Sequence, residues 1–177
     1  MDWKRELVVA HLVKQKVAEA DVGGLWEHIL PEVAATERDI DAVERELGFR
    51  VDPQYRAFLL HADGWRAFHH TLDIFGTRDL LGGDRAEIAA EILATFDDLQ
   101  AVCGIDQKDL VPVAVASNSI DIMLMARPHA PEPGKVFWFA GQLIDTFPGF
   151  DEFFLAMVDY NRLEYQRLVD DSSGTVD

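Results

Sequence analysis

The residues of this chain that are best suited to chemistry are its histidines and the carboxylates near them. His69 and His70 are adjacent, and His61 lies eight residues before His69. This spacing fits no usual set of zinc ligands. Neighbouring residues of a strand point to opposite faces, so at most one histidine of the pair is expected to serve a site. A small hydrolase with a site near His61, His69 and Asp73 is the enzymatic alternative, but the pattern favours ordinary histidines, with no bound metal and no cofactor.

Two further features invite a catalytic interpretation. Cys103, the single cysteine, comes just before Gly104 at the predicted end of a helix. A reactive thiolate needs a positive environment such as a helix N-terminus, whereas a helix C-terminus disfavours an anion. Asp97 and Asp98 are neighbours on the same predicted helix and diverge by about 100 degrees, which is typical of a solvated face. The sequence also lacks a glycine-rich phosphate loop and a nucleophile elbow, so we predict that the chain is not an enzyme.

Two tryptophans are the aromatic residues best placed to bind a partner. Trp65 follows Gly64 and is expected in a loop after a helix, and Trp138 lies between Phe137 and Phe139 in a predicted strand. Tryptophan is enriched at binding hot spots, but it is more often used in packing the core. Both uses remain open for each residue.

Charge is the most distinctive property of the composition. The chain has 32 Asp and Glu residues against 16 Lys and Arg, which gives a net charge of −16. Such a surface repels nucleic acid and anionic membranes, because both are bound by placing cations against phosphates. It favours a basic protein partner, since complementary charge speeds encounter and disfavours wrong pairings. Plain solubility is the other use of so acidic a surface.

Length and composition are typical of one globular domain. Hydrophobic residues make up 49% of 177, enough for a sizeable core, and no stretch approaches the roughly 18 apolar residues needed to cross a bilayer. The first residues carry charge with no apolar segment behind them, so no secretory signal is expected. A single cysteine excludes an internal disulfide. We therefore expect a cytoplasmic protein.

The periodicity of apolar residues predicts the elements that must position these side chains. Helical spacing dominates residues 3–63, a long helix is expected over 84–103, and another begins at Phe150. The predicted fold is α+β, with one antiparallel sheet of about five strands, near 71–75, 111–116, 120–126, 135–139 and 142–147, and helices packed around it. We expect a single domain over 1–170, including an N-terminal helical extension over 1–29, and a flexible tail over 171–177. Predicted core residues are Phe58, Leu59, Ile74, Val113, Ile122, Val136 and Phe154.

A series of short motifs follows in order along the chain. These segments are Glu44–Gly48, Asp52–Leu60, Asp63-Gly64, Leu72–Gly76, Val113–Ala116, Ile120–Leu124, Gly134–Phe137 and Phe150–Phe154. In order and spacing they resemble the SUKH superfamily of Smi/Knr-type proteins, over about residues 30 to 160. One departure lies at Asn118-Ser119-Ile120-Asp121, where the family commonly has a glycine-aspartate turn, so the turn geometry there stays open.

The resemblance implies a function in binding another protein. The function it implies is that of a bacterial immunity protein, an antitoxin that binds and neutralises a cognate toxin, often a nuclease. Nuclease toxins are typically basic because they bind phosphates, so the acidic chain could imitate the charge of nucleic acid. The superfamily also includes a fungal cell-wall assembly regulator that acts as an interaction hub, and a regulatory scaffold is therefore the alternative. We expect a protein toxin as partner, no nucleic-acid or membrane partner, and a monomer or weak homodimer.

A binding face should combine acidic side chains with an aromatic anchor. Charge sets the rate of encounter, while a desolvated aromatic side chain slows dissociation. The candidate partner-binding residues that satisfy both conditions are expected at one edge of the sheet, with the two carboxylates of the long helix as second choices. They are Asp63, Trp65, Asp73, Asn118 and Asp121, followed by Asp97 and Asp98.

Overall fold

Capping residues fix where the first three helices begin. In the computed structural model, which describes residues 1–173, these helices are α1 (Trp3–Ala20), α2 (Glu37–Leu47) and α3 (Pro53–Leu59). Thr36 and Asp39 form the predicted capping box of α2, and the carboxylate of Asp52 accepts from the amides of Gln54 and Tyr55 at the start of α3. These side chains satisfy amides that have no partner within the helix, so the local sequence is sufficient to place both helix starts.

The sheet is antiparallel throughout and has six strands in the order β1-β2-β3-β4-β5-β6. The strands are β1 (Trp65–His69), β2 (Leu72–Ile74), β3 (Leu110–Ala116), β4 (Asp121–Ala126), β5 (Val136–Ala140) and β6 (Leu143–Phe147). The predicted α+β fold is confirmed, with β1 as an additional strand. The expected loop position of Trp65 is wrong, because Trp65 begins β1 and pairs with Ile74.

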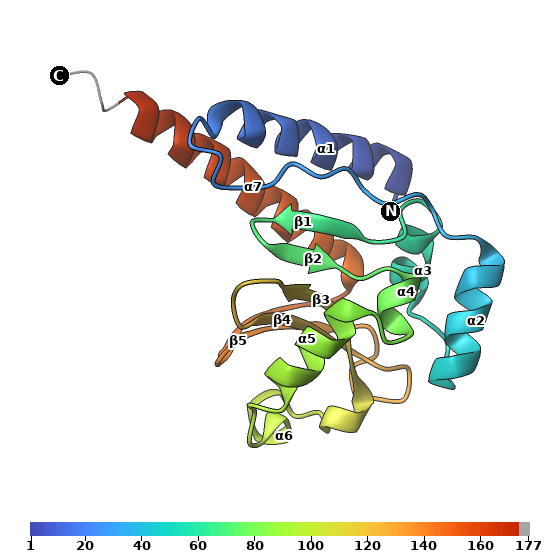
Figure 1. The fold of residues 1–177 in the computed structure, drawn as a ribbon. Helices are drawn as coiled ribbons and strands as arrows, with labels where there is room; N and C mark the ends of the chain where they lie inside the picture. The colour runs from blue at the N-terminus through green and yellow to red at the C-terminus, as the bar shows by residue number, and fades with distance from the viewer. Residues whose placement is uncertain (174–177) are drawn as a thin grey trace.

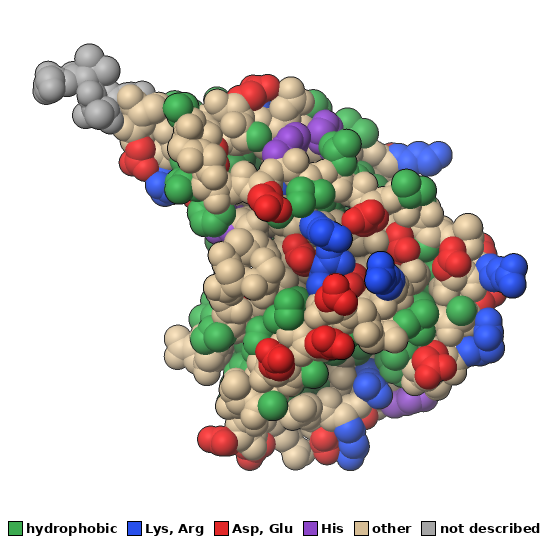
Figure 2. Space-filling model, in the orientation of Figure 1, with side chains coloured by type: hydrophobic (Ala, Val, Ile, Leu, Met, Phe, Trp, Pro, Cys, Tyr) green, Lys and Arg blue, Asp and Glu red, His purple; other side chains and the backbone are tan. Residues whose placement is uncertain are grey.

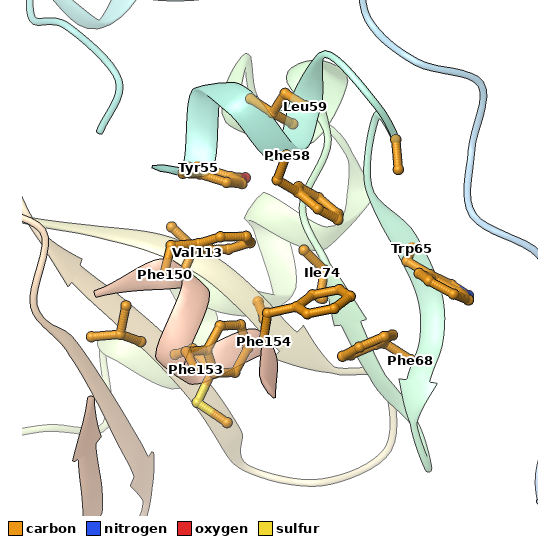
Figure 3. Packing of buried hydrophobic residues seen from close by; sticks show 14 of the residues in the cluster. Tyr55, Phe58, Leu59, Trp65, Phe68, Ile74, Val113, Phe150, Phe153 and Phe154 are labelled. Carbon is orange, nitrogen blue, oxygen red and sulfur yellow. The ribbon is translucent and has the colours of Figure 1, made fainter. Parts of the chain in front are cut away.

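Helices cover both faces of the sheet (Figure 1). On one face, α1, α3 and the C-terminal helix α7 (Phe150–Ser173) build an aromatic core with β1 to β6, part of which is shown close up in Figure 3. On the other, α5 (Asp84–Leu93) and α6 (Leu99–Cys103) pack on a second apolar cluster. All seven predicted core residues are fully buried. None of the described helices is both long and apolar enough to cross a membrane.

The long helix expected over 84–103 is divided in two. The chain leaves the helix after Leu93, where the hydroxyl of Thr95 donates to the carbonyl of Ile92 at 2.7 Å. A new helix, α6, starts after Asp98, whose carboxylate accepts from the amide of Ala101 at 2.9 Å. Apolar periodicity continues through the break because both pieces bury residues against the same face of the sheet. Two short turns complete the described elements: α4 (Thr77–Leu80) and a 3₁₀ turn, η1 (Gln107–Asp109).

The N-terminal extension is helical only to Ala20. Residues 22–36 then run without helix or strand beside β1 (Figure 1). The amide of Glu32 donates to the carbonyl of Gly64 at 3.0 Å, and the amide of Ala35 donates to that of Leu59 at 2.9 Å. These bonds fix the segment to the residue before β1 and to the end of α3. At the other end, the expected tail begins as the last turn of α7, and residues 174–177 lie outside the described part of the chain.

Candidate partner-binding site

The predicted binding residues do not meet at one edge of the sheet. Asp63 and Asp73 line a hollow of about 520 Å³, which we call the charged hollow and define by Asp63, Arg66, Asp73, Arg78, Asp79 and Arg85. Asn118 and Asp121 line a second one of about 280 Å³, the tryptophan pocket, defined by Trp26, His69, His70, Asn118, Asp121 and Trp138. Leu72 lines the pocket and Asp73 the hollow. Since successive strand residues face opposite sides, the two concavities lie on opposite faces of the sheet.

In the charged hollow, carboxylates are engaged with the protein itself. Asp73 accepts from the amide of Ala67 at 2.7 Å and from Nε of Arg85 at 2.8 Å. Arg85 also donates to buried Asp79 at 2.9 Å, which accepts in turn from the amide of Gly76. The Asp73 contact supports an irregular stretch of β1 in which Ala67 has φ 46°. A carboxylate used in this way holds the fold together and leaves less charge for a partner.

Asp63 and Trp65 also have structural partners. Asp63 accepts from the amide of Thr77 at 2.6 Å and from its hydroxyl at 2.7 Å, at the start of α4. Trp65 is 1% exposed, and its indole donates to the carbonyl of Ile29 at 2.8 Å. Figure 3 shows Trp65 on β1, beside the core. Trp65 presents no surface to a partner, so it is not available as the aromatic anchor of a binding face.

Asp97 and Asp98 lie in the connection between α5 and α6 rather than on a helix face. Both are exposed, and neither lines the charged hollow or the tryptophan pocket. Asp98 caps α6, whereas Asp97 lies one residue before this cap. Cys103 lies at the C-terminal end of α6, with its Sγ 3.6 Å from the carbonyl of Ile105. This part of the surface brings no other predicted site residue together with the two carboxylates.

The tryptophan pocket pairs an acidic side chain with a partly buried indole. Trp138 is partly buried, and its Nε1 donates to Oδ1 of Asp121 at 2.7 Å. The register explains this contact, because Trp138 lies opposite Met123 on β4, and Asp121 comes two residues earlier on the same face. Asp145 on β6 lies directly opposite Trp138 on the other side. The sheet therefore places Trp138 between two carboxylates.

Three aromatic rings form a stack at the other side of the pocket. The rings of Trp26 and His70 are 3.9 Å apart between centroids and 16° from parallel, and those of His70 and His69 are 4.0 Å apart and 28° from parallel. The prediction that the two histidines point to opposite faces is wrong. His70 lies in the turn after β1 with φ 51°, a left-handed conformation that interrupts the alternation of a strand and brings both rings together.

Side chains of α7 hold the polar atoms of His69 and Trp26 in place. Nδ1 of His69 lies 3.0 Å from Oδ1 of buried Asn161, while the amide of Asn161 donates to the carbonyl of Phe68 at 2.8 Å. The Asn161 oxygen is an acceptor, so Nδ1 of His69 carries the proton. Trp26 donates through Nε1 to Glu164 at 2.8 Å. The rings are thus fixed by α7, which contributes both Asn161 and Glu164.

Both imidazoles of the stack are neutral at neutral pH. Burial, reinforced by the adjacent His70, lowers the pKa of His69 to about 4, and burial also lowers the pKa of His70. Glu164 has its pKa lowered to about 2, mainly because Arg167 donates a hydrogen bond to it. The stack therefore presents uncharged imidazole rings, and the carboxylate of Glu164 beside it stays ionised.

His69 makes stability depend on pH. Its pKa is about 6.5 in an unfolded chain and about 4 in the folded protein, so the unfolded chain takes up its proton first as the pH falls. The resulting stabilisation is complete above pH ~6.5 and is lost toward pH ~4. We expect acidification from pH ~7 to ~4.5 to cost about 2 kcal/mol more in the wild type than in His69→Asn, measured by urea unfolding.

The groups facing His69 set the controls for this measurement. The pKa of His70 is lowered as well, so His70→Asn should also reduce the acid sensitivity, whereas Glu164 stays ionised through this pH range because its pKa is about 2. Lys14, which faces His69 from α1, donates to the carbonyls of Ala67 and Phe68 and has a pKa of about 8 because of burial. Equal acid sensitivity in the wild type and both variants would contradict the assignment.

The residues of the enzymatic alternative are not brought together. His69 lines the tryptophan pocket, Asp73 the charged hollow on the opposite face, and His61 lies exposed with Nδ1 2.8 Å from the carbonyl of Ala57. Among residues 1–173, no group of three or more His, Cys, Asp or Glu side chains is placed to hold a metal ion. The geometry supports no hydrolase site built from these three residues.

Sequence reasoning missed two contributors to the tryptophan pocket. The sequence pattern leaves Trp138 open between core and binding, and Trp26 is not among the predicted binding residues. The register of β4 and β5 is the signal for Trp138, since it puts an indole diagonal to Asp121 on one face. Trp26 has no comparable signal, because its partners His70 and Glu164 come from distant parts of the chain.

Comparison with known proteins identifies the family. Among curated proteins, none matches this chain. The model of the SMI1 / KNR4 family (SUKH-1) matches residues 34–156, which include α2 to β6 and the first part of α7. The match covers more than half of the chain and confirms the resemblance found in the sequence. The chain belongs to the SMI1 / KNR4 family (SUKH-1).

Proposed function

We propose that this chain is an immunity protein that binds and neutralises a cognate bacterial toxin in the cytoplasm, with a basic nuclease-type toxin as the partner. The observation that carries the proposal is a net charge of −16 on a member of a family of interaction and immunity proteins. A nuclease needs cations to bind phosphates. An acidic inhibitor is steered toward that surface and competes with the nucleic acid for it.

The distribution of charge favours steering by the whole molecule. Figure 2 shows acidic side chains spread over the face that carries α5, with basic side chains between some of them. In the charged hollow the carboxylates are partly neutralised by Arg85. The excess charge therefore acts over a distance, where it raises the association rate and weakens with added salt. Short-range contacts must then supply the slow dissociation.

A regulatory scaffold that holds several partners is the alternative function. Two separate concavities on opposite faces of the sheet are the observation that favours it. The two functions differ in stoichiometry, because an inhibitor forms one complex with one toxin while a scaffold binds two partners at once. Sedimentation of the purified complex distinguishes them, and it also tests the expected monomer or weak homodimer.

The test of neutralisation uses a toxin domain encoded beside the gene for this chain. Cells that express the toxin domain alone are expected to die, and cells that also express this chain to survive. The purified proteins should form a stable complex whose association rate falls as salt rises. An immunity protein for an unrelated toxin is the control. If the cells die equally and the two purified proteins do not associate, the proposal is wrong.

A further inference from the structure

We propose that the tryptophan pocket binds an arginine side chain of the protein partner, as the anchor of the interface. Its volume of about 280 Å³ lies just below the ~300–1,000 Å³ typical of sites for small molecules and cofactors. A pocket of this size suits one long side chain. The inference rests on the proposed function for the identity of the partner, but the chemistry of the pocket is argued from its own residues.

The lining of the pocket selects a cation. It contains the side chains of Trp26, Trp138 and Asp121, together with the two histidines, and no Lys or Arg. Two cations act on the histidines from outside: Lys14 and Arg167. Each has partners of its own, since Lys14 donates to β1 carbonyls and Arg167 to Glu164. An anion such as a phosphate finds no counter-charge in the lining.

The acidic group is already oriented for a second contact. Oδ1 of Asp121 accepts from Trp138 at 2.7 Å, and Oδ2 accepts from the hydroxyl of Ser119 at 2.5 Å. A carboxylate offers about four acceptor positions, so both oxygens keep capacity for a guanidinium. The two existing contacts fix the side chain and reduce the entropy lost on binding. Asp145, the cross-strand neighbour of Trp138 on β6, adds negative charge beside the same indole.

The aromatic rings supply the other half of the recognition. A planar guanidinium is attracted to the face of an indole and stacks on it more readily than an ammonium does. Trp138 meets Tyr160 edge-on at 5.7 Å and 80°, a contact that does not stack a second ring on the indole. Because the pKa values of the histidines are lowered, their rings carry no charge that would repel the guest. Arginine therefore fits both the carboxylate and the aromatic wall.

The first experiment tests the pocket without a partner. The full chain is titrated with N-acetyl-arginine amide and, as a neutral control of the same shape, with N-acetyl-citrulline amide, while the indole N–H signal of Trp138 is followed by NMR. Weak, saturable binding of the arginine compound is expected, reduced about tenfold in Asp121→Asn. Asp97→Asn removes the same charge from an exposed position outside the pocket and should leave binding unchanged. Equal binding of both compounds, or no effect of Asp121→Asn, would overturn the proposal.

The second experiment separates this proposal from the proposed function. If a toxin is neutralised, Asp121→Asn should raise the dissociation rate about tenfold and Asp97→Asn should not. Neutralisation that is unaffected by Asp121→Asn refutes the pocket and leaves the function standing. Selective arginine binding without neutralisation supports the pocket and refutes the function. A homodimer that is lost in Trp138→Ala would show that a second copy occupies the pocket and would also refute the proposal.

Discussion

Replacing Phe154 by alanine is expected to lower the free energy of unfolding by about 4 kcal/mol. Phe154 is fully buried and lies where three helices meet the sheet. Its ring stacks on that of Phe68 of β1, with 4.8 Å between the ring centroids, and meets the ring of Trp3 of α1 edge-on, with 5.2 Å between the centroids. The centroid of its ring also lies 5.9 Å from that of Phe58 of α3, and Figure 3 shows Phe154 with Phe58 and Phe68. Removal of the ring leaves a cavity that rigid neighbours cannot fill.

The measurement is urea unfolding followed by circular dichroism, with an unchanged dependence on denaturant as the sign that folding stays cooperative. Leu155→Ala is the matched control, because Leu155 is the next residue of α7 and is 38% exposed. Truncation of the Leu155 side chain should lower the free energy of unfolding by about 1 kcal/mol or less. If the two variants lose equal stability, α7 does not pack on the sheet as described.

Replacing Gly76 by alanine is expected to destabilise the fold by about 3 kcal/mol. A Cβ atom at Gly76 would lie 2.2 Å from the backbone oxygen of Asp63 and 2.9 Å from its Oδ1. The segment around Asp63 is held at this distance because the carboxylate of Asp63 accepts from the amide of Thr77. Gly64 faces the same crossing, since its own Cβ would lie 2.7 Å from the amide nitrogen of Gly76. Neither backbone can move without breaking these contacts.

Gly23→Ala is the control for this substitution. Neither Gly23 nor Gly76 has a positive φ, and the nearest atoms to a Cβ at Gly23 are side-chain atoms at 3.9 Å. The change there should alter stability by about 0.5 kcal/mol or less. Thermal unfolding of both variants checks the difference. A Gly76→Ala variant as stable as Gly23→Ala would mean that the segments at Gly64 and Gly76 cross at a greater separation. It would also contradict the structural role assigned to Asp63.

The N-terminal extension belongs to the same core although the family match begins after it. Trp3 is 3% exposed. The centroid of its ring lies 5.4 Å from that of Phe58 and 5.9 Å from that of Phe150. The match starts at residue 34. Helix α1 therefore adds a third helix to the aromatic cluster on this face of the sheet, and it carries Lys14, which supports β1 from the side.

The sequence by itself determined the elements whose signals are local. The caps at Thr36 and Asp52 set the starts of α2 and α3 because their partners lie within three residues. Apolar spacing located the strands β2 to β6 and the helix α7, and it identified the seven core residues, since burial of a regular face leaves a regular pattern. The ordered motifs also identified the family, which the match over residues 34–156 confirms.

Only the tertiary structure decided the position of β1 and the make-up of the tryptophan pocket. The backbone of β1 is irregular at Ala67, and it is held there by Lys14, Asp73 and Asn161, which donate to it or accept from it. Lys14 and Asn161 lie more than fifty residues away along the chain. A local pattern carries no trace of partners so distant. The stack of Trp26 on His70, and the contact of Trp138 with Asp121, likewise depend on a left-handed turn and on strand register, which become fixed when the sheet and helices pack together.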